Sequence, residues 1–129
     1  MGIFLLQSKT GSLGERLGCD YLRKKGYKIL ATNYFNTTGR RLGEIDIVAK
    51  KDGKLVFVEV KTRVLERRNF ILPEENITHG KLHKLERIAS YYLREKKQTN
   101  MPYTFDALSI VYDSSSKKAQ IRHLESIFL

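Results

Sequence analysis

The sequence predicts a small α/β domain in which a mixed β-sheet is flanked by helices, in the order α-β-β-β-α-β-β. Two observations carry this prediction. Apolar residues recur at helical spacing in two segments, one before and one after a block of strands. Within that block two alternating runs are joined by Asp52-Gly53, a specific signal for a β-hairpin. The 129 residues are long enough for one domain with a single core.

Each predicted element has its own boundary signals. Ser12 begins a helical stripe that Gly26 ends, and Thr78 can cap a second helix that fades after Leu93. Residues 64–76 have no clear period and are expected to form a loop. The expected elements cover residues 12–25 (helix), 27–31, 42–50 and 54–63 (strands), 78–93 (helix), and 103–112 and 119–124 (strands). All belong to one domain, 1–129, with residues 1–10 as a loose N-terminal segment.

Charge is the strongest feature of the composition. Twenty-four Lys and Arg residues against fourteen Asp and Glu give a formal net charge of +10. This excess favours a polyanionic partner, with nucleic acid ahead of an anionic membrane surface. No apolar run approaches the roughly 20 residues of a membrane span, so no membrane partner is expected. A soluble basic protein without an anionic partner is the alternative that charge alone leaves open.

Cysteine usage bears on the compartment. The single cysteine, Cys19, excludes an internal disulfide and a cysteine-based zinc cluster. A reducing cytoplasm is therefore the expected location. Residues 1–7 lack both the length and the basic flank of a signal peptide.

The hairpin places charged side chains on defined faces of the sheet. Successive strand residues point to opposite faces. In residues 44–48 the two acids are therefore expected on one face, with Ile45 and Ile47 on the other. In the second strand Glu59 and Lys61 share a face.

The register of this hairpin brings two acids together. If residues 52–53 form a two-residue turn, Asp46 lies directly opposite Glu59, and Glu44 lies opposite Lys61. Opposed Cβ atoms are about 4.5–5.5 Å apart, so two ionised carboxylates there repel each other. A divalent cation removes the repulsion, because carboxylate oxygens suit Mg²⁺ or Mn²⁺. Lys61 beside the cation could orient an attacking water or stabilise charge on a phosphate.

The acid pair is also compatible with a site that holds no metal. One of the two acids could be protonated, or Lys61 could neutralise both as a structural salt bridge. A β-bulge would shift the register by one residue and remove the pairing.

Glu15 has two interpretations that the sequence leaves even. Ser12 and Glu15 have the spacing of a capping box, in which the acid bonds back to the helix start. Alternatively, Glu15 shares a helical stripe with Cys19, which would direct it toward the sheet. Gly14 and Gly18 would then allow backbone or ligand to approach closely.

Lysines and arginines near the hairpin are candidates for phosphate contacts, because these side chains supply much of the backbone contact to DNA. The candidates are Arg40, Arg41, Arg63, Lys81 and Lys84, together with Arg67, Arg68 and Arg87. The three histidines, His79, His83 and His123, form no recognisable ligand set and are expected at the surface.

Two motifs carry a resemblance to a known family, Gly43-Glu44-Ile45-Asp46 and Phe57-Val58-Glu59-Val60-Lys61-Thr62-Arg63. With Gly14-Glu15 upstream, and Phe105-Asp106 and His123 downstream, the chain resembles the YraN-type family of uncharacterised bacterial proteins. That family is similar to the restriction-endonuclease-like superfamily, in particular to archaeal Holliday-junction resolvases. The resemblance implies a restriction-endonuclease-like, resolvase-like core.

The superfamily pattern is an acid, then an acid-x-Lys on the next strand, with a glutamate on the first helix. It implies Asp46 and Glu59 as metal ligands joined by the carbonyl of Val60, Lys61 as the catalytic lysine, and Glu15 as the helix-borne acid. The implied cofactor is Mg²⁺ or Mn²⁺. The chain departs from the superfamily pattern where Ile45 replaces a usual proline.

These observations together predict a metal-dependent endonuclease that hydrolyses phosphodiesters in DNA, favoured over RNA, in branched or damaged structures. The alternative is a non-catalytic nucleic-acid-binding module that keeps the fold and the basic surface. A protein-interaction adaptor is a third hypothesis, which leaves the opposed acids unexplained. Symmetric cutting of a junction needs two active sites, which would suit a homodimer, although no sequence feature marks a dimer face.

Overall fold

A computed structural model describes residues 3–65 and 79–127, with side chains described for residues 13–65 and 81–127. In these residues two helices flank a five-stranded sheet. The elements are α1 (Ile3–Lys24), β1 (Lys28–Tyr34), β2 (Ile45–Lys51), β3 (Lys54–Leu65), α2 (His79–Glu95), β4 (Tyr103–Asp113) and β5 (Lys118–Leu124). This order confirms the predicted α/β, resolvase-like core. The loop expected over 64–76 lies outside the described residues, apart from its first two residues, which extend β3.

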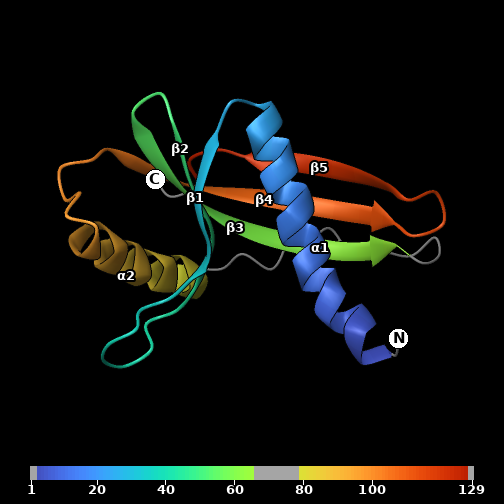
Figure 1. The fold of residues 1–129 in the computed structure, drawn as a ribbon, viewed down its shortest axis with the longest axis horizontal. Helices are drawn as coiled ribbons and strands as arrows, with labels where there is room; N and C mark the ends of the chain where they lie inside the picture. The colour runs from blue at the N-terminus through green and yellow to red at the C-terminus, as the bar shows by residue number, and fades with distance from the viewer. Residues whose placement is uncertain (1–2, 66–78, 128–129) are drawn as a thin grey trace.

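The sheet has the strand order β1-β2-β3-β4-β5. Three of the four neighbouring pairs are antiparallel, and β3 and β4 are parallel. The parallel pair is joined by the chain that contains α2, as a parallel connection requires. Figure 1 shows α1 crossing one face of the sheet, with α2 on the other side near β2 and β3. The two faces therefore have separate cores.

Aromatic side chains dominate the core beneath α2. Phe57 of β3 is 1% exposed, and its ring meets those of Tyr92 and Phe105, each with centroids 5.6 Å away. Ile88 and Ala89 of α2 are buried in the same cluster. The helical stripe that predicts α2 thus faces the sheet as expected.

Two glycines let α1 lie close against the other face of the sheet. A Cβ atom at Gly14 would overlap the hydroxyl of Thr62 on β3, and one at Gly18 would lie 3.1 Å from Leu108 Cδ1. The predicted close approach at these glycines is therefore made by the sheet itself. The core of this face consists of Cys19, Leu22, Ile47, Ala49, Val56, Val58, Leu108 and Ile110.

The helix α1 begins earlier than the sequence predicts and ends where it predicts. It starts at Ile3, so the backbone of Ser12 lies inside the helix and not at its first turn. At the other end Gly26 has φ +93°, and Tyr27 N bonds to Leu22 O at 2.9 Å, the closure of a Schellman motif. Of the helices described, neither has the length and apolar character needed to cross a bilayer.

Replacing Gly14 with alanine should destabilise the fold, because the new methyl group collides with Thr62. Overpacking costs about 1–3 kcal/mol, and the helix propensity of alanine offsets about 1 kcal/mol of this. We expect a net loss of about 1 kcal/mol in the free energy of unfolding, measured with urea. The double variant Gly14→Ala/Thr62→Ala should be more stable than Gly14→Ala alone. Equal stability of these two variants would show that α1 does not depend on this contact.

Candidate functional site

The two hairpin strands keep the predicted register and then part at Asp46. Their five ladder pairs run back from the turn at 52–53 to Ile47 and Val58, which confirms the two-residue turn. Beyond them Val60 N donates a 2.8 Å hydrogen bond to Asp46 Oδ2. A side chain of β2 therefore satisfies an amide of β3 just past the end of the ladder.

The expected alternation of faces breaks at Asp46. The prediction that Ile45 and Ile47 share a face is wrong, because Ile45 lies in the core beneath α2 and Ile47 in the core beneath α1. On the neighbouring strand β1, Asn33 has φ +52° between the residues that pair with Ile47 and Ile45. The Asp46 carboxylate thus departs from a regular strand position and reaches the Val60 amide.

Three carboxylates converge at this point from three different elements. Glu15 of α1, Glu44 of the β1–β2 connection (residues 35–44) and Asp46 of β2 each offer an oxygen, and all three oxygens lie within 4.8 Å of one another. We call these residues the acid cluster. Since Ser12 lies within α1, the capping-box interpretation of Glu15 fails, and Glu15 faces the sheet instead.

Glu59 and Lys61 lie beside the acid cluster as an ion pair. Lys61 Nζ is 3.2 Å from Glu59 Oε1, and both side chains are largely buried. The expected pairing of Glu44 with Lys61 gives way to a contact between Glu44 Oε2 and Arg41 Nη2 at 3.1 Å. The reason is that Glu44 precedes β2 and lies outside the ladder. The predicted ladder pair of Asp46 with Glu59 does not form, because the ladder ends at Ile47 and Val58, although the charge of Glu59 still acts on Asp46. The register does not assign Glu44 to the cluster.

The electrostatics of the site act most strongly on Asp46. Burial, followed by the nearby charge of Glu59, raises the pKa of Asp46 to about 7. Glu44 and Glu15 contribute to this rise, and the hydrogen bond from Val60 opposes it. Burial and three neighbouring acids therefore both oppose the ionisation of Asp46.

Lys61 also contacts a basic residue on α2. Its amine lies within hydrogen-bonding reach of the Lys81 amine. Burial lowers the pKa of Lys61, but the contact with Lys81 and the charge of Glu59 outweigh it and raise the pKa overall. The pKa of Lys81 is lowered, first by the contact with Lys61. Two amines thus lie beside the Glu59 carboxylate.

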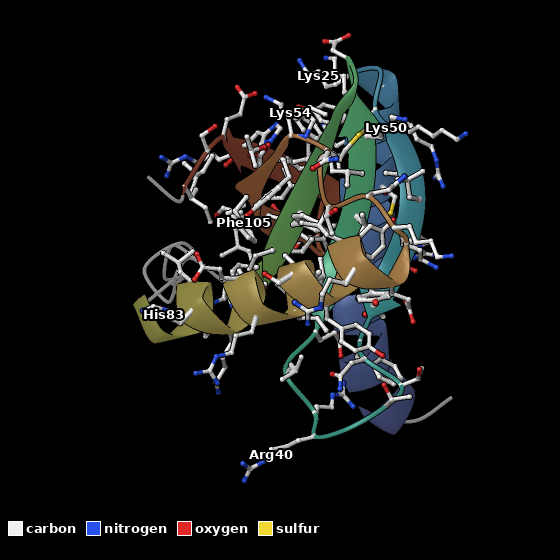
Figure 2. The ribbon with its side chains drawn as sticks, turned by 90° about the vertical axis from the view of Figure 1, so that its left-hand side faces the viewer. Lys25, Arg40, Lys50, Lys54, His83 and Phe105 are labelled. Atoms are coloured by element: carbon white, nitrogen blue, oxygen red, sulfur yellow. The ribbon has the colours of Figure 1, made fainter. Side chains whose placement is uncertain are left out.

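Three further basic candidates are exposed. Arg40 projects from the tip of the β1–β2 connection (Figure 2). Arg63 on β3 and Lys84 on α2 are exposed as well. His83 is exposed on α2, as predicted. Arg67 and Arg68 and the side chain of His79 lie outside the described residues.

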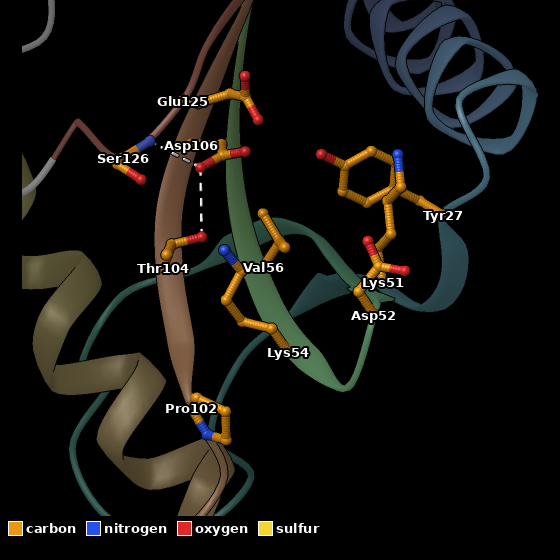
Figure 3. Close-up of a pocket in the computed structure, with 10 residues that line it drawn as sticks. All are labelled: Tyr27, Lys51, Asp52, Lys54, Val56, Pro102, Thr104, Asp106, Glu125 and Ser126. Carbon is orange, nitrogen blue, oxygen red and sulfur yellow. Dashed lines mark hydrogen bonds between the residues drawn. The ribbon is translucent and has the colours of Figure 1, made fainter.

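His123 is not a surface histidine, which corrects the sequence prediction. Its Nε2 lies 2.7 Å from Oδ2 of Asp106, and the side chains are only 10% and 3% exposed. Asp106 Oδ1 also accepts a 2.9 Å bond from Ser126 N (Figure 3). On the other side of the imidazole, Nδ1 faces the Tyr21 hydroxyl at 3.4 Å. Asp106 and His123 thus tie β4, β5 and the C-terminal segment to α1.

A cavity of about 360 Å³ opens beside this tie (Figure 3). It lies at the turn end of the β2–β3 hairpin, where Lys51 and Asp52 form part of its wall. The acid cluster lies at the opposite end of that hairpin. The cavity and the acid cluster are therefore separate features. The residues that line the cavity are Tyr27, Lys51, Asp52, Lys54, Val56, Pro102, Thr104, Asp106, Glu125 and Ser126.

The greater part of the chain matches the sequence model of one protein family. That family is described as "Uncharacterised protein family UPF0102", and its model matches residues 14–110. The chain belongs to family UPF0102. This confirms the resemblance to the YraN-type family, which UPF0102 denotes. The matched residues include the whole acid cluster, Glu59 and Lys61.

Relatives within UPF0102 cover nearly the full chain. A UPF0102 protein of Syntrophomonas wolfei is 40% identical over 123 residues, which are 95% of this chain and 100% of the relative. One from Caldicellulosiruptor bescii is 38% identical over 121 residues, which are 93% of this chain and 97% of the relative. A third, from Alkaliphilus metalliredigens, is 36% identical over 123 residues, covering 95% and 100%.

Asp46→Asn should change how stability depends on pH in the presence of EDTA. The carboxyl has a pKa of 3.8 as its ordinary value and about 7 in the folded protein. Its stabilising contribution is therefore complete below about pH 4 and is lost as the pH rises through about 7. Asparagine cannot ionise. Between pH 5 and pH 8 the free energy of unfolding of the variant should therefore rise relative to that of the wild type, by an amount on the order of a few kcal/mol.

Urea unfolding at several pH values measures this difference. Asp52→Asn is the matched control, since it removes the same charge from an exposed position on the turn of the same hairpin. A difference between Asp46→Asn and wild type that stays constant across the pH range would contradict the electrostatic description of the site.

Asp106→Ala should destabilise the fold through lost hydrogen bonds. It leaves His123 Nε2 and Ser126 N without the buried acceptor that both now share. We expect a loss of about 2–6 kcal/mol in the free energy of unfolding, about 1–3 kcal/mol for each of the two polar groups left unpaired. Asp113→Ala is the control, because Asp113 also accepts backbone bonds from Ser115 and Ser116, but at an exposed turn. A similar loss in both variants would show that burial of the tie contributes little.

Proposed function

We propose that this protein is a Mg²⁺- or Mn²⁺-dependent endonuclease-like phosphodiesterase that acts on DNA. The observation that carries the proposal is the acid cluster, in which Glu15, Glu44 and Asp46 come within 4.8 Å of one another. The ion pair of Glu59 and Lys61 beside it adds a further carboxylate and a cationic group. Acids that hold a cation next to a lysine fit the hydrolysis of a phosphodiester.

The donor set fits a hard divalent cation. Carboxylate oxygens suit Mg²⁺ and Mn²⁺, and the cluster has no sulfur or imidazole ligand among its members. The pKa of Asp46 is raised to about 7 by burial and by its acidic neighbours, because the acids oppose one another's ionisation. A positive charge among the acids would instead lower the pKa of Asp46. In our proposal Asp46 and Glu59 hold the cation with the carbonyl of Val60, and Glu15 and Glu44 complete the site.

The cation, when bound, supplies Lewis-acid stabilisation of the charge that develops on a phosphate oxygen. The protein's own side chains position the phosphate and stabilise its charge. Lys61 supplies a cationic amine beside the acid cluster, so we assign it to positioning and stabilising negative charge on the phosphate. Glu59 orients Lys61 through the 3.2 Å contact.

The basic surface supports a nucleic-acid substrate. The chain has a net charge of +10, and Arg40, Arg63 and Lys84 are exposed on the connection, strand and helix that adjoin the site residues in the sequence. Such side chains contact phosphates without reading sequence. The same surface also favours a second candidate, a non-catalytic nucleic-acid-binding module, because its charge does not depend on the acids.

Cleavage assays distinguish the two candidates. Purified protein is incubated with linear, nicked, flapped and four-way DNA in Mn²⁺, in Mg²⁺ and in EDTA. We expect cation-dependent products that fall by at least about 100-fold in Asp46→Asn, Glu59→Gln and Lys61→Met, the loss typical of removing one charge-stabilising group. Asp52→Asn, at the exposed turn of the hairpin, should keep full activity.

Cation binding is measured separately by calorimetry. Wild type and Asp52→Asn should bind Mn²⁺, and Asp46→Asn should bind it at least tenfold more weakly, as is typical when a metal site loses a supporting group. Salt-sensitive DNA binding without products in any cation would favour the non-catalytic module. A folded wild type that binds neither Mn²⁺ nor Mg²⁺ would rule out the metal site.

A further inference from the structure

Three large hydrophobic side chains are exposed among the described residues, and one of them lies near the acid cluster. Leu30 is on β1, and Tyr103 begins β4 at the turn end of the hairpin, against Phe57 and Phe105. Phe35 differs from both. It is 43% exposed in the β1–β2 connection, the segment that also carries Glu44 of the acid cluster.

Arg41 connects the ring of Phe35 to the acid cluster. The guanidinium carbon lies 4.4 Å from the centre of the Phe35 ring, a cation–π contact. On its other side, Arg41 Nη2 lies 3.1 Å from Glu44 Oε2. A single guanidinium group therefore bridges the aromatic ring and one of the three clustered carboxylates. One side chain therefore separates the ring from the candidate metal site.

The connection that carries Phe35 is held in place by its own side chains. Asn36 is 6% exposed, and its amide nitrogen donates bonds of 2.8 Å to the carbonyl oxygens of Thr38 and Arg40. Its amide oxygen accepts a 2.9 Å bond from Leu42 N. The hydroxyls of Thr38 and Tyr91 lie 2.8 Å apart and fasten the connection to α2. Figure 1 shows this connection projecting beyond the sheet and past α2. The aromatic ring is thus presented on a preformed support.

We propose that Phe35, backed by Arg41, is a stacking platform for one unpaired nucleobase beside the cleavage site. This inference rests on the proposed function and names its substrate class. A nucleobase has two π-faces that stack on aromatic rings and on guanidinium groups. In an intact duplex the neighbouring bases cover those faces, whereas a flap, bulge or junction leaves some uncovered. The platform therefore selects nucleic acid with an unpaired nucleotide next to the phosphate that is cut.

The charge of the surroundings favours a nucleic acid over a protein partner. Arg40 lies exposed at the tip of the same connection (Figure 2), and the chain as a whole has a net charge of +10. An exposed aromatic with interleaved arginines is the composition of single-strand binding surfaces. A second copy of this basic chain would instead bring like charges together. The nucleobase is thus the occupant to which we commit.

The test compares two DNA duplexes that differ by one unpaired 2-aminopurine nucleotide, in EDTA so that binding is measured without cleavage. The wild type should bind the bulged duplex more tightly and quench the 2-aminopurine fluorescence. Phe35→Ala should lose about 5- to 150-fold in affinity for the bulged duplex, the range for the loss of one stacked base. Its affinity for the fully paired duplex should not change. Phe35→Tyr should keep both the preference and the quenching.

Tyr103→Leu is the matched control, since it removes an exposed aromatic ring at the opposite end of the hairpin. It should behave as the wild type does. Unfolding in urea checks that Phe35→Ala is folded, as expected for an exposed side chain. Equal losses on the bulged and paired duplexes would overturn the proposal. So would a wild-type dimer, seen by sedimentation, that Phe35→Ala dissociates, because the ring would then face a second copy.

The outcomes for the platform and for catalysis can be separated. Phe35-dependent preference for the bulged duplex, with no cleavage in any cation, supports the platform and counts against the endonuclease. Cation-dependent cleavage that Asp46→Asn abolishes, with no effect of Phe35→Ala on either duplex, supports the endonuclease and overturns the platform.

Discussion

The hydrogen bond from the Val60 amide to the Asp46 carboxylate determines how the candidate site is built. It is 2.8 Å long and lies just past the last ladder pair of β2 and β3. In a strand that kept its alternation from Val48 backwards, Asp46 would point toward α2 and away from Glu15 on α1. Because the carboxylate instead turns to the β3 backbone, acids from both sides of the sheet can meet it. The carboxylates therefore converge because Asp46 departs from the regular alternation of its strand.

Two further contacts bring the other carboxylates to that position. Gly14 allows α1 to approach Thr62, so the next residue along the helix, Glu15, reaches the strand end. Asn36 closes the β1–β2 connection on itself through three bonds to the backbone, and Glu44 follows that closure. Neither contact involves a candidate metal ligand directly. Each holds an element close to Asp46, against the repulsion that the acids exert on one another.

The sequence predicts the parts of this arrangement that depend on neighbours along the chain. The Asp52-Gly53 turn and the alternation of β3 are local signals, and they place Asp46 near Glu59 and Lys61. The break in alternation at Asp46 was missed, because it depends on contacts with other strands. Clustering of Glu44 with Glu15 was missed for the same reason, since the register assigned Glu44 to a partner on β3.

The tie between Asp106 and His123 was missed although a signal for it exists. Asp106 lies within an apolar strand, from Phe105 to Ile110, and a buried carboxylate requires hydrogen-bond partners. That rule predicts a partner without saying which residue it is, and here the partner is seventeen positions along the chain. Phe35 illustrates a related limit. An aromatic residue beside a turn is not informative until the structure shows that Arg41 covers its ring.

The charges of the whole chain and of the site have opposite consequences for a phosphate. A net charge of +10 attracts a polyanion from a distance, and exposed arginines and lysines continue that attraction at the surface. At the site itself Glu15, Glu44 and Asp46 repel a phosphate, and Lys61 is already paired with Glu59. If DNA is the substrate, as we propose, this field would bring its backbone to acids that repel it. A divalent cation among the carboxylates would remove this conflict, since it would neutralise the acids where the phosphate must approach. A structural role for the acids would leave the conflict in place, and this is the physical argument for the proposed metal site.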